Sequence, residues 1–205
     1  MRTTIFNTPI LAPILRAISL VVLRLIGWRA ENRLDGTPRK AIILAAPHTS
    51  NWDFLLFLMI VFALRINLNV LIKHTIFWFP LGAFLRYCGA IPVDRRAAGA
   101  RVKELASTFS AYDDMILLIT PEGTRSPRTH WKTGFYHMAE AADVPVIIAF
   151  VDSENKTAGL DHLMPISGDV EADMAHVYGF YDQLKGLVPS NYASPNRPAP
   201  EDSSR

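Results

Sequence analysis

The stretch AIILAAPHTSNWDFLLFLMIVFAL, residues 41–64, contains the pattern that decides the fold. Its first six residues, 41–46, form a short apolar run of the length expected for a buried strand. A polar turn, PHTSN, follows, and the apolar segment Trp52–Leu64 then predicts a helix capped by Ser50 or Asn51. This order of strand, turn and helix predicts an α/β protein.

The rest of the chain continues this alternation. Four more apolar runs predict strands, and three segments between them predict helices. Because strands alternate with helices, we expect a single α/β domain with a mainly parallel, mixed sheet flanked by helices. The predicted strands are 67–72, 90–93, 115–120 and 144–151, and the predicted helices are 75–87, 98–112 and 133–142.

The two ends of the chain differ from this central part. A polar linker, 29–40, carries Asp-Gly and Thr-Pro turn signals and opens the α/β domain at 29–188. The tail, 189–205, is rich in proline and serine, a composition typical of disorder. Residues 1–28 precede the domain as a separate helical segment.

Composition and charge narrow the function classes. Half of the 205 residues are hydrophobic and 20% are charged, which excludes a disordered chain. The single cysteine, Cys88, excludes an internal disulfide and any zinc site built from four cysteines. Residues 1–100 hold 12 Lys and Arg against 4 Asp and Glu, whereas residues 101–205 hold 9 against 15. The basic first half suggests an anionic partner, either nucleic acid or a membrane surface.

The N-terminal segment 5–28 favours the membrane. Arg16 and Arg24 interrupt an otherwise aliphatic sequence, which disfavours a spanning helix, and a signal-peptide cleavage site is missing. Eight residues apart, the two arginines share one side of a helix, with aliphatic residues opposite and Trp28 at its end. This pattern predicts an amphipathic helix in the membrane interface, the alternative being a helix packed on the protein's own core or on a second subunit. Nucleic acid is disfavoured because long aliphatic runs separate the basic residues.

His48 and Asp53 lie where the strand predicted at 41–46 gives way to a helix. At this edge, open α/β sheets bind their ligands. The turn can bring the carboxylate back to the imidazole, where it would fix the tautomer and leave the other ring nitrogen free as a base. A capping aspartate and a hydrogen-bonded histidine would explain the same residues without chemistry.

A second polar stretch, PEGTRS at 121–126, follows the strand predicted at 115–120. Its glycine permits close backbone approach to a ligand, and Arg125 suits a phosphate or carboxylate group. Arg95 follows a third predicted strand. Because parallel strands end at one edge, these groups can converge in one crevice; a tight surface turn with solvated charges is the alternative.

Together, the stretches PHTSNWD, GAIPVDR, TPEGTRS and VPVIIAF resemble, in this order, the four sequence blocks of the glycerophospholipid acyltransferases, typified by 1-acyl-glycerol-3-phosphate acyltransferase. The resemblance covers residues 41–151. It implies that His48 is the catalytic base and that Asp53 supports it. The substrate-binding residues that it implies are Lys73, Arg95, Glu122, Gly123, Thr124 and Arg125.

The resemblance also implies a reaction. An O-acyltransferase of this kind moves a fatty acyl group from an acyl thioester, acyl-CoA or acyl-carrier protein, to a hydroxyl of a lysophospholipid such as 1-acyl-glycerol-3-phosphate. No cofactor and no metal are expected, and the location implied is peripheral and monotopic, on the cytoplasmic face of the inner or plasma membrane.

Three alternatives remain open at this point. The acceptor can be a lyso-lipid built on an amino acid or a sugar, and the chain can be a non-catalytic membrane-binding protein. A hydrolase is disfavoured because the sequence lacks a Gly-x-Ser-x-Gly motif around a nucleophilic serine.

Overall fold

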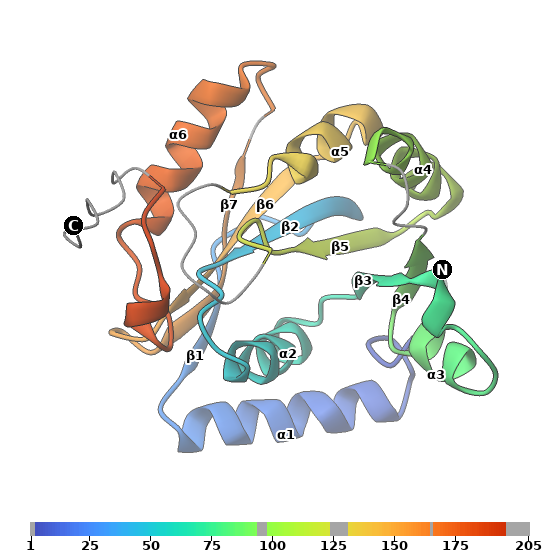
Figure 1. The fold of residues 1–205 in the computed structure, drawn as a ribbon. Coiled ribbons are helices and arrows are strands. Elements are labelled where there is room, and N and C mark those ends of the chain that lie inside the picture. The colour runs from blue at the N-terminus through green and yellow to red at the C-terminus, as the bar shows by residue number, and fades with distance from the viewer. Residues whose placement is uncertain (1–2, 94–97, 124–130, 165, 196–205) are drawn as a thin grey trace, which may run out of the picture.

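Strand β2 (Lys40–Ala46) lies at the centre of a seven-stranded sheet in the computed structural model, which describes residues 3–93, 98–123, 131–164 and 166–195 (Figure 1). The strand order is β1-β7-β6-β2-β5-β3-β4, and every neighbouring pair is parallel except β6 and β7. Helices flank this sheet, so the predicted fold class, one α/β domain with a mainly parallel, mixed sheet, is confirmed.

The other strands are β1 (Arg29–Asn32), β3 (Leu68–Lys73), β4 (Ala90–Val93), β5 (Met115–Ile119), β6 (Val146–Asp152) and β7 (Thr157–Met164). The α-helices are α1 (Leu11–Leu25), α2 (Trp52–Leu64), α3 (Leu81–Tyr87), α4 (Ala98–Ala111), α5 (Gly134–Ala142) and α6 (Val170–Tyr181). Two short 3-10 turns complete the described elements, η1 (His74–Ile76) and η2 (Pro189–Asn191).

The side chains of β2 alternate between two cores. Ile42 and Leu44 are buried with residues of α5 and α6, whereas Ala41 and Ile43 are buried with Val61 of α2. Figure 1 shows α1 and α2 below the sheet and α4 and α5 above it. A strand covered on both faces needs apolar residues at every position, which explains why 41–46 reads as a continuous apolar run.

Helix α1 packs along α2 by a narrow strip. Ser19 and Leu23 are buried in this contact, and Arg16 Nε donates a hydrogen bond to the Ala63 carbonyl at 3.2 Å. The aliphatic side chains on the rest of α1 remain exposed: Ile14, Ile18, Leu20, Val21 and Leu25. Within the described residues, every helix is too short or too polar to cross a membrane.

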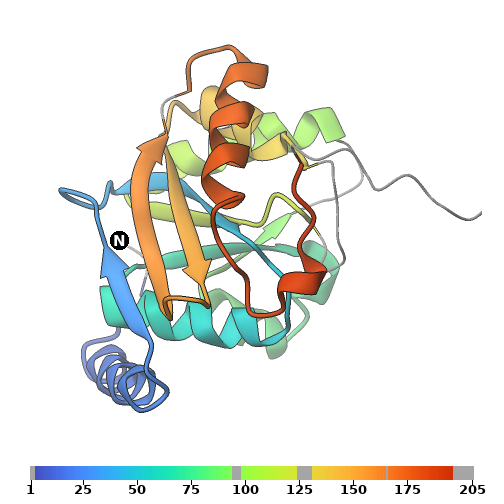
Figure 2. The same cartoon turned by 90° about the vertical axis from the view of Figure 1, so that its left-hand side faces the viewer.

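Segment 29–40 is not a linker throughout, because its first residues form strand β1 at the sheet edge beside β7 (Figure 2). The sequence RAEN lacks the apolar alternation that marks a strand. Gly159 of β7 explains the pairing, since any side chain there would clash with the backbone of Glu31. The strand therefore depends on a partner more than 100 residues away in the sequence.

The predicted helix 75–87 divides into the turn η1 and helix α3. Pro80 precedes α3, and the residue before a proline avoids the helical region, so one continuous helix cannot form. Sequence reasoning also missed β7 and α6. A signal for α6 was present, because Asp169 caps the helix by accepting from the amides of Glu171 and Ala172.

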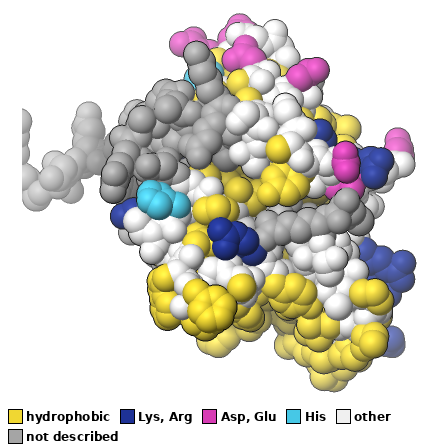
Figure 3. Space-filling view, turned by 90° about the vertical axis from the view of Figure 1, so that its right-hand side faces the viewer, with side chains coloured by type: hydrophobic (Ala, Val, Ile, Leu, Met, Phe, Trp, Pro, Cys, Tyr) yellow, Lys and Arg dark blue, Asp and Glu magenta, His cyan; other side chains and the backbone are white. Residues whose placement is uncertain are grey.

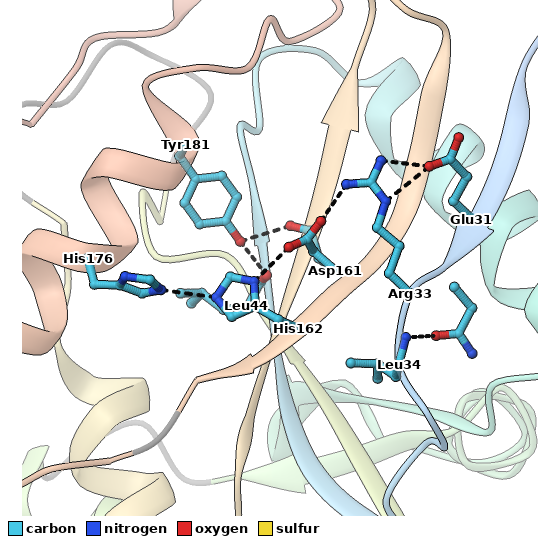
Figure 4. A network of polar contacts seen from close by, with 10 residues as sticks. Glu31, Arg33, Leu34, Leu44, Asp161, His162, His176 and Tyr181 are labelled. Carbon is cyan, nitrogen blue, oxygen red and sulfur yellow. Dashed lines mark hydrogen bonds and ion pairs between the residues drawn. The ribbon is translucent and has the colours of Figure 1, made fainter.

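A polar network fixes α6 and the edge of the sheet (Figure 4). Arg33 pairs with both Glu31 and Asp161, and Asp161 also contacts His162 Nδ1 at 2.7 Å. His162 Nε2 lies 3.1 Å from Nε2 of His176 on α6.

At the end of α6, the buried Tyr181 hydroxyl lies 2.7 Å from the carbonyl of Leu44 and 2.8 Å from that of Ala149. Helix α6 is thus tied to the central strands β2 and β6.

Candidate active site

The carboxyl ends of parallel strands bring the predicted site residues to one edge of the sheet. His48 follows β2, Glu122 follows β5, and Lys73 is the last residue of β3. These strands are neighbours in the order β2-β5-β3, so residues far apart in the sequence reach a common region. Ligands of open α/β sheets bind at this edge.

His48 and Asp53 form a direct pair. Asp53 Oδ2 lies 3.1 Å from His48 Nδ1, and Asp53 is buried while His48 is half-buried. With a proton on Nδ1 directed to Asp53 Oδ2, the neutral imidazole carries its lone pair on Nε2. The pair therefore has the arrangement of a general base supported by a carboxylate.

Asp53 also shapes the turn that carries His48. Its Oδ2 accepts hydrogen bonds from the amides of Thr49 at 2.5 Å and Ser50 at 2.7 Å. The predicted cap of α2 takes a different form, because Asn51 makes no side-chain cap bond and Ser50 Oγ accepts from the Trp52 amide at 3.2 Å. One carboxylate thus orients the imidazole and the two residues after it.

Glu122 contacts the same turn from β5. Its Oε2 accepts a hydrogen bond from the His48 amide at 2.8 Å, and the side chain is buried. Burial raises the pKa of this carboxyl to about 7, against the opposing effects of the His48 amide and imidazole. The resemblance implied that Glu122 binds substrate, whereas its contact favours a positioning role for His48.

An apolar pocket of about 120 Å³ lies beside the pair. His48 and Asp53 form part of its wall, and most other lining side chains are aliphatic or aromatic. The apolar lining includes Ala45, Pro47, Phe54, Phe57, Leu118 and Phe150. A polar base beside an apolar cavity suits a substrate with a reactive group attached to a hydrocarbon chain.

The remaining predicted residues take different positions. Lys73 is exposed at the end of β3, and Gly123 is exposed with a φ of 66°, a conformation that glycine adopts readily. The end of the Lys132 side chain lies beside Gly123, in the space that a side chain at this position would occupy. Three predicted residues lie outside the described part of the chain: Arg95, Thr124 and Arg125.

Backbone amides near the pair are largely engaged. The amides of Thr49 and Ser50 donate to Asp53, and the Gly123 amide donates to the Thr120 carbonyl at 3.3 Å. Amides of these two turns are the natural candidates to stabilise the oxyanion of an acyl transfer. In this structure, these three amides already donate hydrogen bonds within the two turns.

The C-terminal segment 184–192 contacts the His48 turn, and sequence reasoning missed this contact. Thr49 Oγ1 accepts from the Val188 amide at 3.1 Å, and the Thr49 carbonyl accepts from Asn191 Nδ2 at 2.9 Å. The disorder predicted from Pro189 onward is therefore wrong for Pro189–Asn191, where η2 forms. Residues 196–205 lie outside the described part of the chain.

Comparisons with known proteins agree with this geometry. The sequence matches the family described as Acyltransferase over residues 29–150, which is more than half of the chain. No curated protein matches it in sequence. Among solved structures, it is similar to PlsC, the 1-acyl-sn-glycerophosphate (LPA) acyltransferase from Thermotoga maritima. The two share 14% sequence identity with a TM-score of 0.55, over 84% of this chain and 77% of that chain. At this identity the structural likeness shows a common fold, and the family match carries the assignment: the chain belongs to the acyltransferase family.

Proposed function

We propose that this protein transfers a fatty acyl group from an acyl thioester, acyl-CoA or acyl-carrier protein, to a hydroxyl of a lysophospholipid such as 1-acyl-glycerol-3-phosphate. The observation that carries the proposal is the His48–Asp53 pair beside an apolar pocket. Membership of the acyltransferase family supports the reaction type. The acceptor is suggested by the name of the Thermotoga maritima enzyme, whose fold is similar.

The proposed reaction needs a base because the thioester is already activated and the alcohol is not. His48 Nε2 takes the hydroxyl proton as the oxygen attacks the thioester carbonyl carbon. The carbon–sulfur bond then breaks, and the imidazolium returns the proton to the departing thiolate. Asp53 stabilises the imidazolium through Nδ1. General-base catalysis of this kind contributes ~10²–10⁴-fold to the rate.

The acyl chain would occupy the pocket, and the anionic group of the acceptor would lie at the strand ends. The apolar pocket offers a surface for an acyl chain, whose burial is worth ~0.8 kcal/mol per CH₂ group. Lys73, Arg95 and Arg125 would hold the anionic group of the acceptor, with Gly123 allowing its close approach and Thr124 as a further contact. Fixing the acceptor in this way contributes to the rate by positioning the hydroxyl near His48. The reaction so written uses no metal and no cofactor.

We also propose that the enzyme is monotopic and that α1 lies on the membrane surface. Its exposed aliphatic side chains and Arg24 suit the interface between head groups and acyl chains. A lyso-lipid that stays in the bilayer during the reaction avoids the cost of exposing its acyl chain to water.

The test of the chemistry is His48→Ala. Turnover of acyl-CoA with 1-acyl-glycerol-3-phosphate should fall by ~10²-fold or more, because the base is lost. Asp53→Asn should lose less, since the imidazole keeps part of its basicity. Exposed His137 on α5 provides the control, and His137→Ala should keep wild-type turnover. A His48→Ala enzyme as active as the wild type, with thiol release still dependent on the acceptor, would exclude the assigned base.

A further inference from the structure

Large aromatic side chains are exposed around α3, which lies on the same side of the molecule as α1 (Figure 1). In the turn before α3, Trp78 is 61% exposed and Phe79 is 88% exposed, and Phe84 on α3 is 61% exposed. Figure 3 views the right-hand side of Figure 1 and shows hydrophobic side chains gathered along its lower edge. Helices α1 and α3 lie on this lower side in Figure 1. An apolar patch of this kind on a protein surface marks a contact with a partner or a membrane.

The turn that presents these residues, called here the aromatic wedge (Phe77–Phe84), is held by its own backbone. The Gly82 amide donates to the Trp78 carbonyl at 2.7 Å, and a side chain at Gly82 would clash with the Phe77 backbone. The Arg86 guanidinium lies over the Phe77 ring, 5.0 Å from its centre. Because the turn is fixed in this way, Trp78 and Phe79 point outward at little further cost in conformational entropy.

The charges around the wedge indicate what it contacts. From α1 to α3, excluding the β1 edge at 29–40, the exposed Lys and Arg side chains are Arg24, Arg65, Lys73 and Arg86. The one acidic residue of these elements, Asp53, is buried at the active site. Figure 3 shows the acidic side chains on the upper part of the face, away from the hydrophobic edge. Basic and aromatic residues without exposed acids suit an anionic lipid surface, where tryptophan favours the interface.

Exposed aromatic side chains also lie at the pocket beside His48. Phe54 lines the pocket beside His48, yet 60% of its surface is exposed, and the neighbouring Trp52 is 70% exposed. The first turn of α2 therefore extends the apolar lining of the pocket to the protein surface.

We propose that the aromatic wedge inserts into an anionic bilayer as a second contact beside α1, and so turns the pocket at His48 toward the lipid. This proposal rests on the proposed function only for the nature of the substrate. Insertion into the membrane is a matter of binding and does not depend on the reaction. Two separated contacts fix the orientation of the protein on the membrane, whereas one helix alone leaves it free to rotate about the helix axis.

The test compares full-length wild type with the double variant Trp78→Ala, Phe79→Ala. Co-sedimentation with phosphatidylcholine vesicles containing phosphatidylglycerol should weaken at least about tenfold, because two large apolar side chains no longer leave water. Leu163→Ala on β7 is the control, an exposed aliphatic residue away from the wedge, and should bind as the wild type does. Quenching of tryptophan fluorescence by brominated acyl chains should fall in Trp78→Leu, a variant that keeps an apolar side chain.

The chemistry is measured separately with a short-chain, water-soluble lysophosphatidate. The double variant should keep wild-type turnover of this acceptor while losing turnover of the vesicle-borne one. Equal vesicle binding by wild type and double variant would overturn the proposal. So would a change from dimer to monomer in light scattering without a change in vesicle binding, which would assign the wedge to a second copy of the chain. A wild type inactive on the soluble acceptor would contradict the proposed function and leave the binding result valid.

Discussion

Glu122 holds its carboxyl group in surroundings that disfavour its charge. Burial is the largest effect and raises its pKa to about 7, while the His48 amide and imidazole act in the opposite direction. The folded protein therefore holds this proton more tightly than the unfolded chain, where the pKa is near the ordinary value of 4.5. The resulting stabilisation is present in full below that value and is lost as the pH rises through about 7.

Glu122→Gln should remove this pH dependence, because the amide keeps an oxygen acceptor for the His48 amide but does not titrate. Between pH 5 and pH 7.5, roughly the range of the shift, the Tm of the wild type should fall by several degrees relative to that of the variant. Thermal unfolding of both proteins across this range measures the difference. Parallel Tm curves would mean that the carboxyl group ionises in the folded protein as it does in the unfolded chain.

At the scale of elements, the segment after α6 supports the turn that carries His48. Ser153 anchors it to the end of β6, since its amide donates to the Lys185 carbonyl and its hydroxyl to the Gly186 carbonyl, both at 2.8 Å. Gly186 then passes so close to Thr49 that a side chain there would overlap it. The turn that carries His48 is therefore held by α2, by β5 and by this segment.

Asn191→Ala removes the contact from Asn191 Nδ2 to the Thr49 carbonyl. We expect kcat to fall about threefold to thirtyfold with little change in KM, because a hydrogen bond worth about 1 kcal/mol or somewhat more would hold the turn of the proposed base, His48, without touching the substrate. Ser190→Ala, an exposed neighbour, is the control. The pH profile of kcat, measured by steady-state kinetics, separates this role from a structural one. Partial unfolding would lower the amount of active enzyme and leave that profile unchanged. A change in KM alone would instead place Asn191 in substrate binding.

Local sequence patterns were sufficient to predict the elements that are built from continuous apolar runs. Strand β2 and helix α2 could be predicted because every β2 residue from 41 to 46 is apolar and the polar turn between them is short. The pairing of His48 with Asp53 is equally local, because the two residues are only five positions apart in the sequence. Contacts between distant parts of the chain leave no such pattern. The Glu122 contact with His48 spans 74 residues, and the Asn191 contact with Thr49 spans 142. For the same reason, β1 could not be found without its partner β7.

On the face of the molecule drawn in Figure 3, the acidic side chains and the hydrophobic side chains gather in different parts. Helices α1 and α3, which carry exposed aliphatic and aromatic side chains, lie on the lower side in Figure 1, and acidic side chains gather on the upper part of the face in Figure 3. Such a division orients a protein on an anionic surface before any side chain inserts. Both the apolar and the electrostatic contribution should therefore be visible in membrane binding, and only the second is weakened by salt.

The test of α1 is best made by substitution. Removal of residues 1–28 would uncover Leu56, Ile60 and Ala63, which are buried under α1, so loss of binding could not be separated from unfolding. Ile18→Asn, Val21→Asn and Leu25→Asn together replace exposed side chains and leave the buried Leu23 in place.

This triple variant should keep the wild-type Tm to within a few degrees and bind anionic vesicles at least about tenfold more weakly, because three aliphatic side chains no longer leave water on binding. In high salt, wild-type binding should decrease in part, since the attraction of Arg24 and its neighbours to the lipid is screened while the apolar contact remains. Liposome co-sedimentation at low and high salt measures both effects, with Leu163→Ala as the matched aliphatic control. If the triple variant and the wild type sediment equally at both salt concentrations, the exposed face of α1 does not contact lipid and a second protein surface must cover it.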